Sequence, residues 1–265
     1  MAALIDTHCH FDFTAFDHDR EAVWQACQSN GMAGLLIPST RASQFQRTLD
    51  VCAQHPQWYP LLGLHPYFLE EHQDGHLELL ENEVEAHGNA LVGIGEIGLD
   101  FYHGRNFAKR QMGFVMAQLS IAKNARLPVV IHSRKANDEV LKCLNDSHFE
   151  QGGIVHAFSG SMQQAERLID KGFMLGFGGA MTYERANNLR DLLRHLPEHA
   201  LSFETDAPDM NPSFIQADQR NSPANLTQIV QMIAELRQVP VAELIDRHEQ
   251  RVVQLFDLQR RSNEH

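Results

Sequence analysis

Short apolar segments alternate with amphipathic segments along almost the whole chain. The apolar segments are predicted strands, at residues 4–10, 34–39, 60–66, 90–96, 127–132, 153–156, 173–177 and 201–206. The amphipathic segments are predicted helices, at residues 19–30, 42–54, 76–87, 107–126, 136–146, 161–171, 184–195, 222–237 and 241–256. Eight strand–helix units in 265 residues average about 33 residues each, which is typical of a (β/α)8 barrel. The predicted fold class is therefore α/β, a TIM barrel.

The predicted strands are short and apolar, as expected for a parallel sheet that helices cover on its faces. No linker, low-complexity tract or second-domain boundary interrupts them, so we expect a single TIM-barrel domain over residues 1–265. The longest irregular stretch, residues 207–221, would lie over the mouth of such a barrel. A doubly wound open sheet has the same alternation, and periodicity alone does not exclude it.

Composition indicates the class of protein. Hydrophobic residues make up 43% and charged residues 21% of the chain, as in a soluble globular protein. No apolar run approaches the ~18 residues of a membrane span, and the first residues lack the apolar core of a signal peptide. We therefore expect a cytoplasmic protein, and no sequence feature indicates an obligate protein partner. The four cysteines have no CxxC spacing, which argues against a thiolate zinc site and a disulfide framework.

Metal-binding residue types fall at the carboxyl ends of the predicted strands, where TIM barrels build their active sites. They are His8, His10, Glu96, His132, His156 and Asp206. Alternation along strand 4–10 would point His8 and His10 in the same direction, although an isolated pair of this kind is as compatible with packing as with metal binding. In a closed barrel, all six side chains would meet at one end.

Four imidazoles and two carboxylates exceed what a single tetrahedral ion with an open position accepts. They suit two divalent ions about 3.5–4 Å apart that share a carboxylate and a water. The expected ligands are His8, His10 and Asp206 for one ion, His132 and His156 for the other, and Glu96 between them. Mixed nitrogen and oxygen ligands favour Zn, Mn, Co or Fe, and Mg remains possible. Asp206 and Glu96 are the predicted catalytic residues, with Asp206 as the general base.

The segments around these residues resemble the TatD family of metal-dependent hydrolases. They are residues 5–10 (IDTHCH), 95–100 (GEIGLD), 131–134 (IHSR), 156–160 (HAFSG) and 204–208 (ETDAP), with 63–66 (GLHP) and 220–223 (RNSP) fitting the same pattern. The resemblance implies a TIM barrel, a two-metal site on the six residues above, and hydrolysis of nucleic-acid phosphodiesters, often from the 3′ end. Two positions depart from the pattern: Ala157, where Cys is common, and Arg251, where Asn is common. Neither is a proposed ligand.

Further residues are candidates for contacts around this site. Arg134 shares the side-chain direction of His132, so it could clamp a phosphate, or pair with a loop acid instead. His65 could donate to a phosphate or carry a proton, or only pack in its loop. Glu204 could hold a ligand histidine by a hydrogen bond, or form a plain buried ion pair. Asp6 is expected to have a structural role.

The net charge of −12 argues against binding nucleic acid through bulk electrostatics, so any phosphate must be attracted locally. Basic residues follow several predicted strands, namely Arg41, Arg105, Arg134, Lys135, Arg185 and Arg220. Aromatic residues stand near the same edge, namely Phe11, Phe13, Tyr67, Phe101, Tyr102, Phe158 and Tyr183. Together they could guide a single strand and stack on its bases, although each taken singly is more often a solvated charge or a packed ring.

The leading interpretation is a phosphodiesterase or 3′–5′ exonuclease that attacks DNA or RNA ends with a water activated by two metal ions. The alternative enzyme hydrolyses a small ester, amide or lactone, or an aminoacyl-tRNA ester, at the same centre. Many dinuclear barrel hydrolases bridge their ions with a modified lysine on strand four, where this chain has Glu96, and this difference favours the nuclease branch. A non-catalytic binding protein would show gaps in the ligand set, and the sequence shows none.

Overall fold

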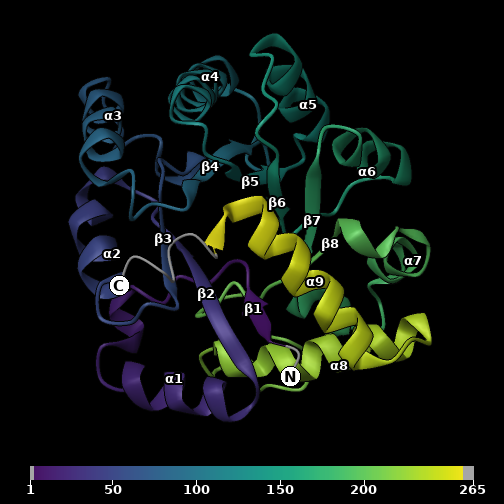
Figure 1. The fold of residues 1–265 in the computed structure, drawn as a ribbon. Helices are drawn as coiled ribbons and strands as arrows, with labels where there is room; N and C mark the ends of the chain where they lie inside the picture. Colours follow the sequence, from purple (N-terminus) through teal and green to yellow (C-terminus); the bar gives the residue numbers. More distant parts are fainter. Residues whose placement is uncertain (1–2, 259–265) are drawn as a thin grey trace.

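The computed structural model describes residues 3–258 and contains a sheet of eight parallel strands in the order β1 to β8 (Figure 1). The strands are β1 (Leu4–Asp6), β2 (Met32–Pro38), β3 (Trp58–Leu62), β4 (Gly93–Asp100), β5 (Val129–Arg134), β6 (Gly153–His156), β7 (Phe173–Phe177) and β8 (Leu201–Phe203). The helices around the sheet are α1 (Arg20–Ser29), α2 (Phe45–Cys52), α3 (Gly75–His87), α4 (Ala108–Ala125), α5 (Asn137–Asp146), α6 (Met162–Ile169), α7 (Asn187–His195), α8 (Leu226–Arg237) and α9 (Val241–Phe256). Short 3₁₀ turns join them: η1 (Thr14–Phe16), η2 (Ala42–Gln44), η3 (Pro66–Phe68), η4 (Gly179–Thr182), η5 (Glu198–Ala200) and η6 (Pro223–Asn225).

The first and last strands meet just beyond their ends. The backbone N–H of Thr7 donates to the carbonyl of Phe203 (3.1 Å), and the N–H of Asp206 donates to the carbonyl of His8 (2.9 Å). Because these bonds join the continuations of β1 and β8, the sheet closes into a barrel. The TIM-barrel prediction is confirmed, and the alternative of an open doubly wound sheet is wrong.

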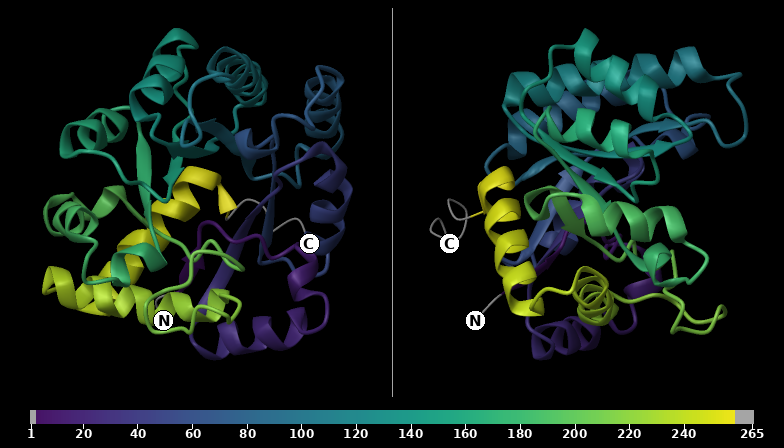
Figure 2. Two further views of the ribbon diagram at one scale, coloured as in Figure 1. Left: turned by 180° about the vertical axis from the view of Figure 1, so that it is seen from behind. Right: turned by 90° about the vertical axis from the view of Figure 1, so that its right-hand side faces the viewer.

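The barrel interior has an apolar core that α9 seals. Side chains alternate along each strand, so one set packs under the outer helices and the other faces inward. The inward set packs against Val252 and Phe256 of α9 and consists of Ile5, Leu36, Leu61, Val92, Val130, Ile154 and Met174. α9 also contacts η5, which precedes β8, and it lies across this end of the barrel (Figures 1 and 2). The amino-terminal ends of the strands are therefore closed, and a site can form only at the opposite end.

Three strands are shorter than predicted, and one of them, β3, ends at Leu62 rather than at residue 66. β1 ends at Asp6 rather than at residue 10, and β8 ends at Phe203 rather than at residue 206. β1 and β8 end early because of the buried carboxylate of Asp6. Its Oδ1 accepts the backbone N–H of both His8 and Thr205 (3.1 Å each). In each strand, a bond to a side-chain oxygen thus takes the place of a bond to the backbone carbonyl of a neighbouring strand. His8 and His10 therefore lie on an irregular segment, and the predicted strand alternation does not explain their direction.

The predicted helices agree with the structure to within a few residues, except that segments 42–54 and 222–237 begin as the turns η2 and η6. None of the described helices is long and apolar enough to span a membrane. The predicted domain 1–265 extends beyond the described residues at both ends, and its bounds stay a prediction.

Candidate metal centre

Glu96 lies in the middle of β4, at a bulge. Between Ile94 and Ile97, β4 advances by three residues while β5 advances by two. The N–H of Glu96 is thereby free to donate to the carbonyl of Ser39 (2.8 Å). A bulge redirects a side chain, and Glu96 is only 1% exposed. The predicted position at the end of the strand is wrong, because β4 continues to residue 100.

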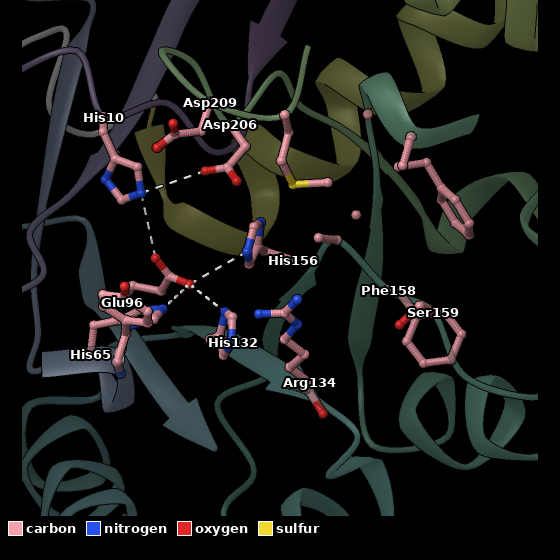
Figure 3. Close-up of a pocket in the computed structure, with 18 of the residues that line it drawn as sticks. His10, His65, Glu96, His132, Arg134, His156, Phe158, Ser159, Asp206 and Asp209 are labelled. Carbon is pink, nitrogen blue, oxygen red and sulfur yellow. Dashed lines mark hydrogen bonds and ion pairs between the residues drawn. The ribbon is translucent and has the colours of Figure 1, made fainter. Parts of the chain in front are cut away.

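One carboxylate oxygen of Glu96 faces a first group of donors. Its Oε2 lies 3.2 Å from Nε2 of His8 and 3.6 Å from Nε2 of His10. Oδ1 of Asp206 lies 3.5 Å from both of these nitrogens. Figure 3 marks contacts from His10 to both Glu96 and Asp206. Ligand atoms of His8, His10 and Asp206 all lie within 4.8 Å of one another, close enough to share a cation.

The other carboxylate oxygen of Glu96 faces a second group of donors. Its Oε1 lies 3.0 Å from Nε2 of His65, 3.2 Å from Nδ1 of His132 and 3.4 Å from Nε2 of His156. Figure 3 shows the three rings turned toward this carboxylate. Glu96 thus stands between two groups of donors, as a carboxylate that bridges two ions would. The structure brings all six predicted ligands together and places His65 beside the second group.

Hydrogen bonds determine which ring nitrogen carries the proton in three of these histidines. The donor–acceptor pairs are His10 Nδ1 to Pro38 O (3.1 Å), His132 Nε2 to Asp100 Oδ2 (3.1 Å) and His156 Nδ1 to Glu204 Oε1 (3.2 Å). Because carbonyl and carboxylate oxygens accept, the other nitrogen of each ring faces Glu96 and is the one that can offer a lone pair to a metal ion. Metal-binding histidines are commonly oriented by such a second bond. Nδ1 of His8 has no hydrogen-bond partner within residues 3–258, so its tautomer can adapt to a cation at Nε2.

His65 has the opposite arrangement. Its Nδ1 accepts the backbone N–H of Tyr67 (3.0 Å), and burial lowers the pKa of its ring to about 4, against the opposing effect of Glu96. The ring is therefore neutral, with its proton on Nε2. This nitrogen lies 3.0 Å from Oε1 of Glu96, but Oε1 has no hydrogen-bond partner among the described residues, so the N–H is left to donate to a ligand in the site. His65 consequently presents a hydrogen-bond donor to the site, whereas a metal ligand must present a lone pair.

Asp206 lies in a turn that Asn221 holds in place. Asp206 has the left-handed backbone angle φ +54, which non-glycine residues adopt uncommonly. The side-chain amide of Asn221 donates to the carbonyls of Thr205 (2.9 Å) and Asp209 (2.8 Å), on the two sides of Asp206. Asn221 is fully buried. These bonds keep the strained turn in the conformation that carries the Asp206 carboxylate to His8 and His10.

The electrostatics of the site favour positive charge at its centre. Burial raises the pKa of Glu96, but the surrounding imidazoles outweigh burial and hold it well below its usual range. Burial lowers the pKa of His156, but Glu96, Glu204 and Asp206 outweigh burial and raise it to about 10. A proton is therefore strongly bound where a metal ligand must give it up. Imidazole nitrogens and carboxylate oxygens around such a centre suit a divalent transition metal, so the residues present fit the predicted metals.

A cavity of about 660 Å³ opens above these residues. Its lining runs around the mouth of the described barrel, from His10 after β1 and Thr40 after β2 to Gly178 after β7 and Asp206 after β8. The cavity is therefore a bowl at the centre of the barrel mouth, with lining residues contributed from around its circumference.

Arg134 lies on the rim of this bowl. Its guanidinium stacks on the ring of Tyr102, 3.7 Å from the centroid, and lies 3.9 Å from Oδ2 of Asp100. Its side chain is 47% exposed, so its remaining N–H groups face the cavity mouth and solvent. Lys135 lies over the same ring, 4.7 Å from its centroid. An ion pair is present, but its acid is the last residue of β4 and not the predicted loop acid, and the guanidinium still lines the cavity.

The rest of the predicted rim is less accessible than expected. Phe11 and Phe101 are buried in the core between sheet and helices, because side chains that point away from the barrel axis pack under helices. Besides Arg134, three of the basic residues are paired with acids, namely Arg41 with Glu71, Arg105 with Glu139 and Arg220 with Asp19. Among the described residues, the expected rim therefore keeps Arg134, Lys135 and Tyr102, Arg185 over the ring of Tyr183, and the cavity residues Phe13 and Tyr67, whereas Phe158 is only 1% exposed.

Two residues that the sequence reasoning did not single out support the centre. Asp100 orients His132, and Asn221 holds the turn of Asp206. Extending the predicted strand beyond residue 96 would have placed Asp100 at its carboxyl end and drawn attention to it. No sequence signal other than the family-like segment at 220–223 points to Asn221.

Comparison with known proteins gives a consistent result. A family model described as TatD related DNase matches residues 5–257. The protein named uncharacterized metal-dependent hydrolase YjjV from Escherichia coli K12 is 40% identical over 244 residues, which cover 92% of this chain and 94% of that protein. The 3′-5′ ssDNA/RNA exonuclease TatD of Rahnella sp. is 33% identical over 252 residues, covering 93% and 95%. The crystal structure of the Escherichia coli YjjV protein, a TatD homolog, superposes with a TM-score of 0.92 at 39% identity, covering 97% of this chain and 98% of that chain.

Proposed function

Since the chain belongs to the TatD family of metal-dependent hydrolases, we propose that it is a phosphodiesterase that removes nucleotides from an end of DNA or RNA. One observation carries the proposal: the two oxygens of Glu96 face two separate groups of metal-type donors. Phosphodiester hydrolysis is the chemistry that paired metal ions serve in many nucleases. Relatives named 3′-5′ ssDNA/RNA exonuclease support action from the 3′ end.

The proposed cofactors are two divalent ions, Zn, Mn or Mg. Their ligands would be His8, His10 and Asp206 at one position, His132 and His156 at the other, and Glu96 at both. Ions held there would lower the pKa of a shared water and polarise the phosphoryl oxygen. Glu204 and Asp100 would hold the rings of His156 and His132 for this task.

The protein's own groups would handle the proton and the substrate. Asp206 is the more accessible of the two catalytic carboxylates, with its side chain 15% exposed against 2% for Glu96. It is therefore placed to accept the proton of the attacking water. The Nε2–H of His65 and the guanidinium of Arg134 would donate to the non-bridging oxygens of the phosphate, because both line the cavity as donors.

The shape of the cavity supports action at chain ends. An endonuclease must pass an uninterrupted strand across its site, which requires a groove open in two directions. In the described part of the chain, the lining of this cavity comes from around the whole barrel mouth and includes no extended groove across it, which supports entry of a strand by its terminus. The sequence also predicts a cytoplasmic location, a single domain and no obligate protein partner, and these remain predictions.

The decisive experiment is a substrate panel of single-stranded DNA, duplex DNA, RNA and small esters, each with Mg, Mn or Zn. Wild type is compared with Asp206→Asn and Glu96→Gln. Glu198→Gln is the matched control, because Glu198 is 17% exposed and lies in η5 at the opposite end of the barrel. We expect stepwise shortening of nucleic acid by wild type and by the control, and a loss of about 100-fold or more in the two site variants.

Intact nucleic acids alongside rapid ester hydrolysis would instead favour the alternative, a hydrolase of small esters, amides or aminoacyl-tRNA. Site variants as active as wild type would reject the site itself. A non-catalytic protein would leave the whole panel intact, although the complete donor set argues against that outcome.

A further inference from the structure

The cavity above the candidate metal centre has an apolar half that the proposed chemistry does not use. Its walls come from the β6–α6 and β7–α7 connections, from α7 and from the turn after β8. We call it the apolar chamber, and its residues are Phe158, Phe177, Ala180, Met181, Leu189 and Met210. Figure 3 places Phe158 across the cavity from His10, His65 and Glu96, with Arg134 between them.

The apolar chamber is continuous with the donor groups. Gly176 and Gly178 line the cavity on the side of β7, and both lie against Glu204, the partner of His156. The chamber residues and the metal-binding residues line one cavity, so the two halves are joined. A ligand whose phosphate lies at the centre can therefore extend into the chamber.

The walls suit a flat, uncharged ring. Phe158, Phe177 and Met181 form the deep part of the wall and are at most 2% exposed, whereas Met210 is 38% exposed and its thioether can make a favourable contact with a ring. Polar lining residues on this side, from Ala157 onward, are Ser159, Asp206 and Asp209, and Asp206 already belongs to the centre. Such a wall can stack on any base but has few groups that could read a base edge.

We infer that the apolar chamber binds the base of the terminal nucleotide, so that the enzyme selects ends that carry a base without selecting among bases. The inference rests on the proposed function and adds its substrate specificity. His65 and Arg134 receive the phosphate on the polar side, and the base extends to the opposite side. An end that lacks its base leaves the apolar walls in contact with water, and it therefore binds more weakly.

The test compares two ligands that differ only by the base, deoxyadenosine 5′-monophosphate and 2-deoxyribose 5-phosphate. Their affinities for the Mn-loaded full chain are measured by calorimetry. We expect the nucleotide to bind about tenfold more tightly or better, as base stacking on aromatic residues implies. Ala180→Leu fills the chamber and should bring the affinity ratio toward one. Ala224→Leu is the control, because Ala224 is also a partly buried alanine in a 3₁₀ turn, η6, but lies outside the cavity.

The same proteins are then given single-stranded DNA with either a normal or an abasic 3′ end. Preference for the normal end that Ala180→Leu abolishes supports the inference. Equal affinity for the two small ligands in wild type, or an unchanged ratio in Ala180→Leu with an unchanged melting temperature, overturns it even where DNA is degraded. If the affinity ratio behaves as expected and no DNA is cut, the proposed nuclease function fails and the base site stands. Rapid hydrolysis of a hexanoyl ester that Ala180→Leu suppresses would assign the chamber to an acyl group and overturn the inference.

Discussion

Nδ1 of His156 donates to Oε1 of Glu204 at 3.2 Å, and the same oxygen accepts the N–H of Ala157 at 2.6 Å. Glu204 is only 1% exposed, so these bonds form out of contact with bulk water. They hold the ring of His156 with Nε2 toward Glu96, 3.4 Å from its Oε1. A single carboxylate outside the two donor groups thus decides the direction of one predicted ligand.

Replacing Glu204 with Gln keeps an acceptor for the ring of His156 but removes the negative charge behind it. We expect Glu204→Gln to lower metal affinity about 10-fold or more, since partners of this kind raise the basicity of a ligand histidine. Competition with a chelating dye measures the affinity. The control Glu198→Gln should bind as wild type does, and equal affinity in Glu204→Gln would show that the Glu204 charge is unimportant.

Gly176 leaves room for the Glu204 carboxylate. A Cβ at this position would lie 2.3 Å from Oε2 of Glu204 and 2.7 Å from its Cδ. Gly176→Ala must therefore displace the carboxylate, and we expect a loss of about 1–3 kcal/mol in the free energy of unfolding together with weaker metal binding. Urea denaturation and metal titration measure the two effects.

A glycine in α4 provides the comparison for Gly176→Ala. A Cβ at Gly113 would meet nothing within 4 Å. Gly113→Ala should therefore stabilise the protein by about 0.5–1 kcal/mol through helix propensity. A Gly176→Ala variant as stable as wild type would contradict the assigned packing around Glu204.

Metal ions should stabilise the folded chain, because the donor groups come together only on folding. At a free ion concentration about 100-fold above Kd, the expected gain is ~2.7 kcal/mol for one site. For a chain of this size, this corresponds to a rise of about 5 °C or more in melting temperature, which a chelator should reverse. Glu96→Gln should lose most of the rise, because Glu96 faces both groups. A melting temperature indifferent to Zn, Mn and Mg would argue against a metal centre.

His248, on α9, gives the stability a pH dependence unrelated to the metal centre. It is 1% exposed, its Nε2 accepts the N–H of Phe203 (3.2 Å), and burial lowers its pKa from 6.5 to about 3. The unfolded chain binds this proton near pH 6.5 and the folded chain only near pH 3. The stability contribution is therefore complete above pH 6.5 and is lost as the pH falls from there toward 3, at up to ~1.4 kcal/mol per pH unit.

His248→Gln keeps an acceptor but removes the titration. Urea denaturation at about pH 7, pH 6 and pH 5 measures the free energy of unfolding. This free energy should fall less with decreasing pH for the variant than for wild type. Parallel curves would contradict the assignment to His248.

Much of the architecture was predictable, because alternation of apolar and amphipathic segments is a local signal. Side chains two residues apart on a regular strand point to the same side. Because Val130 and Ile154 face into the barrel, His132 and His156 face the same way. Local patterns also place Asp206 after the last strand. These predictions required only that the barrel close.

The remainder depends on contacts that no local pattern encodes. The bulge at Glu96 shows in the register of β4 against β5, and the end of β1 depends on a bond from Thr205 to Asp6 across almost the entire chain. The proton position on His65 depends on the backbone N–H of Tyr67. Each of these details decides which atom faces the centre, and each is a property of the folded chain.

The seal that α9 forms has a consequence for how the protein is made. Ile5 and Leu36 are synthesised early, yet they pack against Val252 and Phe256 near the other end of the described chain. In a nascent chain on the ribosome, the barrel interior is therefore exposed to water until α9 has emerged. The early strands reach full stability only when this last helix packs against them. Stalled or shortened products that lack α9 should be prime substrates for chaperones and proteases.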